Sequence, residues 1–119
     1  MRTAFAHEAT IVMEDDSDVR APGAAITVAL CGHWDHEPPC PIAPHHTAAD
    51  RRDGVVLVRV LFAAEPDAED EVRARIDTAL ARGTLKGPDG VTSRWRLLDT
   101  RPGRPRAEER PHAEQLRRA

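Results

Sequence analysis

Apolar and polar side chains alternate along the first part of the chain, over residues 3–13. One side of this run carries Phe5, His7, Ala9, Ile11 and Met13. An alternation with a period of two is typical of a β-strand with one buried face. Residues 24–34 alternate in the same way, with Ile26, Val28, Leu30 and Trp34 at the even positions. We therefore predict two strands that pair as a hairpin through the acidic, glycine- and proline-containing segment 14–23.

The most apolar run of the chain extends from Val55 to Ala63 and is interrupted only by Arg59. A strand that is apolar on both faces is expected in the middle of a sheet. The segment before it, 47–54, is polar and ends in Asp-Gly, which predicts an exposed connection with a turn. Residues 91–99 alternate again, with Trp95 and Leu97 facing the core, and predict a last strand.

Residues 65–82 have the features of an amphipathic helix. Pro66 suits the first helical position, and the acidic residues that follow it lie near the positive end of the helix dipole. The buried stripe is predicted to contain Val72, Ile76, Ala79 and Leu80. Gly83 suits a left-handed residue that ends the helix.

The predicted fold class is α+β: a small, mostly antiparallel sheet of about four strands with one helix packed on one face. The expected order is strand, strand, metal loop, strand, helix, strand, with a right-handed crossover and parallel neighbours around the helix. We expect a single domain over residues 1–100, including a Cys/His/Pro-rich loop at 31–46. Residues 101–119 are rich in Arg, Pro and Glu and poor in apolar side chains, which predicts a disordered tail.

The net charge of −3 indicates no strongly charged partner. Nucleic acid is not an expected partner, because the arginines of the tail alternate with acids and lack aromatic neighbours. The start of the chain has no apolar signal region, and no segment approaches the roughly 20 apolar residues of a membrane span. We therefore predict a cytoplasmic protein without a membrane segment. In that compartment its two cysteines are expected as thiolate ligands, with a Cys31–Cys40 disulfide as the alternative.

The segment from Cys31 to His46 contains both cysteines, four of the six histidines and several prolines. Thiolate sulfur and imidazole nitrogen bind borderline and soft metal ions. The candidate ligands are Cys31, His33, His36, Cys40, His45 and His46. Proline before and after Cys40 reduces the entropy lost when such a loop closes on an ion. The Cys-x-x-Cys pairs of zinc ribbons and the His-Glu-x-x-His motif of metalloproteases are absent.

Zinc is the predicted ion, because four ligands of the Cys2His2 type are a common tetrahedral set. Copper, nickel and iron are the alternatives. The expected set is Cys31, His33 and Cys40, with either His36 or His45. His45 and His46 are adjacent and point in opposite directions in an extended chain, so one of the two is expected to bind. In the predicted hairpin His7 or Glu8 is close enough to the loop to act as a further ligand, but for His7 a hydrogen-bonded core histidine is the favoured prediction.

These observations predict a small cytoplasmic transition-metal-binding protein that acts in metal handling or sensing. A protein-interaction or accessory module held by structural zinc is the first alternative. A small metal-dependent enzyme is the second, with an open coordination position and Asp35, His36 or Glu37 as general base. A non-enzymatic role is favoured, because one helix and a small sheet offer little concave surface. The predicted partners are the metal ion and another protein.

Overall fold

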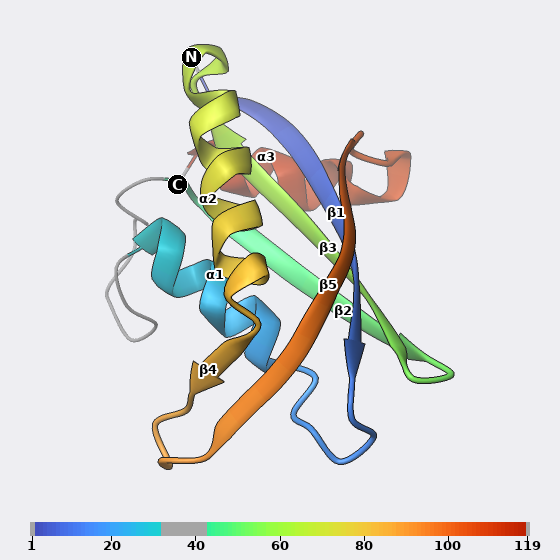
Figure 1. Cartoon of the computed structure of the whole chain (residues 1–119). Coiled ribbons are helices and arrows are strands. Elements are labelled where there is room, and N and C mark those ends of the chain that lie inside the picture. The colour runs from blue at the N-terminus through green and yellow to red at the C-terminus, as the bar shows by residue number, and fades with distance from the viewer. Residues whose placement is uncertain (1, 32–42, 119) are drawn as a thin grey trace.

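The computed structural model describes residues 2–31 and 43–118. Its strands are β1 (Thr3–Met13), β2 (His45–Arg52), β3 (Val55–Ala64), β4 (Thr84–Lys86) and β5 (Thr92–Gly103). Its helices are α1 (Ala21–Cys31), α2 (Glu69–Arg82) and α3 (Arg110–Arg118), and short 3-10 turns precede α2 and α3. The strands form a curled sheet, shown in Figure 1. The α+β class and the antiparallel sheet are therefore confirmed.

The strand order is β2-β3-β1-β5-β4, and all the paired neighbours are antiparallel. Because β3 pairs with both β1 and β2, the strands β1 and β2 run parallel to each other with β3 between them. In the same way β3 and β5 run parallel with β1 between them. Two strand–helix–strand units are thus interleaved, which is the split βαβ arrangement. The predicted hairpin of 3–13 with 24–34 and the predicted parallel neighbours are wrong.

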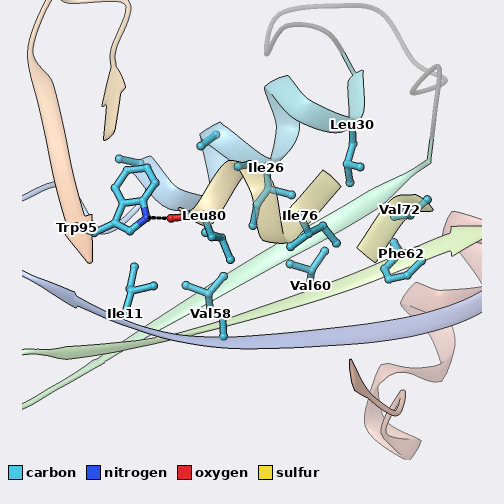
Figure 2. Packing of buried hydrophobic residues seen from close by; sticks show 14 of the residues in the cluster. Ile11, Ile26, Leu30, Val58, Val60, Phe62, Val72, Ile76, Leu80 and Trp95 are labelled. Atoms are coloured by element: carbon cyan, nitrogen blue, oxygen red, sulfur yellow. Dashed lines mark hydrogen bonds between the residues drawn. The ribbon is translucent and has the colours of Figure 1, made fainter. Parts of the chain in front are cut away.

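The main core lies between the sheet and the pair of helices α1 and α2 (Figure 2). The sheet contributes its inner side chains, α1 contributes Ile26 and Leu30, and α2 contributes the predicted stripe. Trp95 closes one end of this core, where its indole N–H donates a hydrogen bond to the carbonyl oxygen of Leu80 at 2.8 Å. Gly83 ends α2 with a φ of 69°, as predicted.

Residues 24–34 were expected to form a strand, but residues 21–31 form α1. The buried residues Ile26 and Leu30 explain the error, because positions four apart share a face in a helix and also share a face in a strand. The feature that distinguishes the two is Pro22, which suits the first turn of a helix and not the middle of a sheet.

The segment 47–54 was expected to be a connection, but most of it belongs to β2. β2 is exposed at most positions because it lies at the edge of the sheet, and this explains its polar sequence. The predicted Asp53-Gly54 turn is present and joins β2 to β3, with φ values of 52° and 81°. Positive φ at both central residues is typical of a two-residue hairpin turn.

The C-terminal residues are ordered, so the prediction of a disordered tail over 101–119 is wrong for residues 101–118. β5 continues to Gly103, and α3 packs against β3 and β1 on the other face of the sheet (Figure 1). Ala113 and Leu116 of α3 form a small second core with Leu61 and Ala63. Two buried side chains and several ion pairs hold this helix on the sheet. The prediction of disorder was based on the small number of apolar residues, and it took no account of stabilisation by ion pairs. No helix in the described parts of the chain has the length and apolarity required to cross a membrane.

Candidate functional site

The predicted metal loop is divided between elements. Cys31 is the last residue of α1, and His45 and His46 begin β2. His33, His36 and Cys40 lie outside the described residues, as do Trp34, Asp35 and Glu37. Only the environments of His45 and His46 can therefore be compared with the prediction.

His45 and His46 point to opposite faces of the sheet, as expected for neighbours in a strand. The Nδ1 of His45 lies 3.0 Å from the carbonyl oxygen of Ala43, and its Nε2 lies 2.9 Å from the hydroxyl of Thr27 on α1. A carbonyl only accepts, so Nδ1 carries the proton and Nε2 accepts from Thr27. The Nε2 lone pair of His45 therefore accepts this hydrogen bond in the structure.

The His46 ring lies on the other face, 4.5 Å from the ring of His112 on α3. Burial lowers the pKa of His46, and the neighbouring His112 lowers it further. His112 belongs to the segment that was predicted to be disordered, but its ring packs beside that of His46. The imidazoles of His45 and His46 cannot meet at one ion, because the sheet separates them.

No group of three or more His, Cys, Asp or Glu side chains within residues 2–31 and 43–118 is arranged to hold a metal ion. This finding contradicts the predicted function in metal handling or sensing. The zinc-module and metal-enzyme alternatives depend on the same ion and are also not supported. The individual assignments to Cys31, His33, His36, Cys40, His45 and His46 and the choice of zinc stay predictions, because most of the expected ligand set lies outside the described residues.

His7 is the one buried polar side chain among the described residues, with 3% of its surface exposed. Its Nδ1 accepts a hydrogen bond from Arg73 at 3.0 Å, so the proton is on Nε2, which donates to Asp77 at 2.7 Å. The Thr100 hydroxyl donates to the same Asp77 oxygen at 2.6 Å and lies 2.9 Å from His7 Nε2. Arg73 also donates to the Ala6 carbonyl at 2.7 Å. The network joins β1, α2 and β5.

This group of side chains contains an imidazole, a carboxylate and a hydroxyl, which are the components of a nucleophilic site. The bonding does not activate the hydroxyl, because its proton goes to Asp77 while the basic nitrogen of His7 is occupied by Arg73. Three hollows in the described surface are lined by other residues. His7 is therefore a hydrogen-bonded core histidine, as predicted. The structure places its partners and those of Glu8 on α2, β3, β5 and the segment that follows β5.

A second network lies on the face of the sheet that carries α3. The guanidinium of Arg59 donates to Glu8 at 2.8 Å and makes two bonds to Glu109, at 2.7 and 2.9 Å. Hydrogen bonds from Arg59 lower the pKa of Glu109 to about 2, and the backbone N–H of Arg106 contributes. This network fixes the turn that leads into α3.

β2 is an edge strand, so some of its backbone N–H and C=O groups point away from the sheet. The Ala63 N–H donates to the Pro44 carbonyl at 3.0 Å. Hydrogen-bonded and non-hydrogen-bonded pairs alternate along an antiparallel ladder, so the even-numbered residues of β2 bond to β3. The N–H and C=O groups of Thr47 and Ala49 consequently point away from the sheet. Within the described residues no hydrogen bond to these outward groups is observed.

A hollow of about 390 Å³ lies between this strand and α1. Its walls come from the start of α1, from the middle of β2 and from the core: Val19, Arg20, Gly23, Ala24, Thr27, Thr47, Ala48, Ala49 and Val58. The helix and the strand approach closely at one point, where a Cβ added to Gly23 would lie 2.6 Å from the Thr47 hydroxyl. The site thus combines a strand edge whose outward groups have no partner within residues 2–31 and 43–118 with a small, mostly apolar hollow.

Sequence reasoning missed this site because it assigned both of its elements incorrectly. Pro22 indicates the helix, and the Asp53-Gly54 turn before an apolar strand indicates a strand ahead of it. Together these two features identify α1 and β2. Comparison of the chain with protein-family models, with curated proteins and with solved structures found no match.

Proposed function

We propose that this domain is a protein-interaction module that binds an extended polypeptide segment as an additional strand on β2. The observation that carries the proposal is the row of outward N–H and C=O groups at Thr47 and Ala49, next to the hollow below α1. Strand addition to a sheet edge takes its affinity from main-chain hydrogen bonds and its specificity from pockets that receive alternate side chains.

The other edges of the sheet are less suited to this role. β4 is only three residues long. The pairing of β5 with β4 ends at Arg94, so the rest of β5 is also an edge. Its register with β1 is irregular between Thr10 and Ile11, and it contains Pro102. Short strands, bulges and proline are the features that protect sheet edges from unwanted pairing. β2 has an unbroken register over eight residues and no proline.

The hollow favours a partner with an apolar side chain. Val19, Ala24 and Val58 form apolar walls, and the Thr47 hydroxyl is the polar group nearest to the close approach of α1. A β-branched aliphatic side chain fits this lining and also favours the extended conformation that strand addition requires. We therefore expect peptides selected for binding to this edge to place Val or Ile opposite the hollow.

The test uses peptides selected on the full chain from a random phage-displayed library, with affinity measured by fluorescence anisotropy. Ala49→Pro removes an outward N–H without removing a bond to β3, and the affinity should fall by about tenfold or more. Asp50→Asn is the matched control, because Asp50 does not line the hollow and its backbone bonds to β3, and it should bind as the unmodified chain does. On binding, amide exchange should slow at Thr47 and Ala49.

Peptides that bind Ala49→Pro as well as they bind the unmodified chain would contradict the proposal. Protection of amides far from β2, with Thr47 and Ala49 unchanged, would contradict it too. The fold of each variant is checked by circular dichroism before affinities are compared.

A further inference from the structure

The structure also indicates a partner for the free edge. We infer that, without another ligand, the strand that adds to β2 is β2 of a second copy of this chain. This inference rests on the proposed function, since it uses the same outward groups of Thr47 and Ala49. Pairing of this kind joins two five-stranded sheets into one continuous sheet across a two-fold axis.

The register follows from which backbone groups are free. With the two-fold axis at Ala48, Thr47 lies opposite Ala49 of the second copy, and Ala49 lies opposite Thr47. Both residues of each pair have outward N–H and C=O groups, so each pair exchanges two hydrogen bonds. Ala48 lies opposite its own counterpart as a non-hydrogen-bonded pair.

The charges on β2 agree with this register. Asp50 lies opposite His46 of the second copy, Arg51 lies opposite His45, and Arg52 lies opposite Pro44, so no two carboxylates and no two guanidinium groups of β2 lie opposite each other. Moving the axis to Asp50 brings the two aspartates directly opposite each other, which is unfavourable. Charge therefore favours an axis at Ala48 over an axis at Asp50.

The helix beside the edge permits a second copy to approach. None of the residues in α1 is charged, although the helix lies next to a hollow in the surface. A surface helix normally carries charged or polar residues on its outer side. On the side that faces the hollow, α1 carries Gly23, Ala24 and Thr27. Small side chains permit the helix axes of two copies to lie about 8–10 Å apart, as in closely packed helices.

The first measurement is sedimentation equilibrium of the full chain, where we expect a dimer. Ala49→Pro removes one hydrogen bond from each side of the axis and should weaken association by about tenfold or more. Ala24→Arg places a charge on the apolar side of α1 and should also give monomers. Ala81→Arg is the control, because Ala81 is exposed on α2 and does not line the hollow, and it should leave the dimer intact.

The second measurement tests the register by disulfide formation in a Cys31→Ser, Cys40→Ser background. In Ala48→Cys the two introduced thiols lie on opposed residues whose Cα atoms are about 4.5 Å apart, within the range for a disulfide. In Asp50→Cys the equivalent atoms are roughly 14 Å apart along the strands. We expect crosslinked dimer from the first variant and none from the second.

A chain that sediments as a monomer and gives no crosslink in Ala48→Cys would overturn this inference. So would a dimer that Ala49→Pro leaves unchanged. If selected peptides still require the outward N–H of Ala49 in that case, the proposed function stands without the second copy. If no peptide requires it, both proposals are overturned.

Discussion

Arg59 and Glu109 form an ion pair with two hydrogen bonds, between the middle of β3 and the turn that leads into α3. The side chain of Arg59 is only 14% exposed and that of Glu109 is 21% exposed. A bidentate pair between a guanidinium and a carboxylate is stronger and more directional than an exposed surface pair. Because α3 buries only Ala113 and Leu116, this pair is a large part of what holds the C-terminal helix on the sheet.

The pair predicts a loss of stability in acid. Glu109 has a pKa of about 2 in the folded protein against 4.5 as its ordinary value. A carboxylate with a lowered pKa stabilises the fold above its unfolded pKa, and that contribution is lost as the pH falls toward the folded pKa. Glu109→Gln should therefore reduce the free energy of unfolding by on the order of 1–3 kcal/mol at pH 7 and by much less near pH 2. Urea unfolding across this range measures the difference.

The control for this prediction is Glu108→Gln, because Glu108 is exposed and precedes the paired residue. It should leave the unfolding free energy nearly unchanged at every pH. A constant difference between Glu109→Gln and the unmodified chain from pH 7 to pH 2 would show that the charge of Glu109 is not the source of the effect.

Breaking the network around His7 should lower the free energy of unfolding, because it leaves a buried N–H without its acceptor. Asp77→Ala removes the acceptor for both His7 Nε2–H and the Thr100 hydroxyl. His7 is buried, so its N–H loses this partner without free access to water. We expect a loss of about 1–3 kcal/mol in the free energy of unfolding. Thr78→Ala, at an exposed position in the interior of the same helix, is the control for helix propensity, and equal losses in the two variants would refute a role for the network.

The parts of the fold that the sequence predicts are those defined by local pattern. The continuous apolar run of β3 and the regularly spaced apolar residues of α2 each predict which side chains are buried. Both predictions are confirmed. α1 failed because Ile26 and Leu30 fit a strand and a helix equally well. β2 failed because an edge strand needs few apolar residues, and its place at the edge is known only once β3 is paired. Likewise, the outward groups of Thr47 and Ala49 depend on which residues bond to β3, and this is a property of the assembled sheet.

Gly83 and Gly90 form a matched pair for testing backbone strain. Both have positive φ, 69° and 84°, a region that favours glycine. A Cβ on Gly83 would lie 2.5 Å from the carbonyl oxygen of Trp95, whereas a Cβ on Gly90 meets nothing within 4 Å. Gly90→Ala should therefore lower the free energy of unfolding by about 1 kcal/mol, because of the unfavourable backbone conformation alone. Gly83→Ala should lower it clearly more, because β5 must also move. Thermal unfolding of the two variants compares them, and equal losses would contradict the contact.

Trp95 of β5 joins the sheet to the C-terminal end of α2 through two hydrogen bonds. Its indole N–H donates to the carbonyl of Leu80 in the last turn of α2, and its own backbone N–H donates to the carbonyl of Gly83 at 2.9 Å. Trp95→Phe keeps an aromatic ring in the core but leaves the Leu80 carbonyl without this donor, so we expect a loss of about 1–3 kcal/mol in the free energy of unfolding. Phe62→Leu, which changes ring packing without touching a hydrogen bond, is the comparison. If the indole bond matters, amide exchange in the last turn of α2 should accelerate in Trp95→Phe and not in Phe62→Leu, and the reverse order would contradict the assignment.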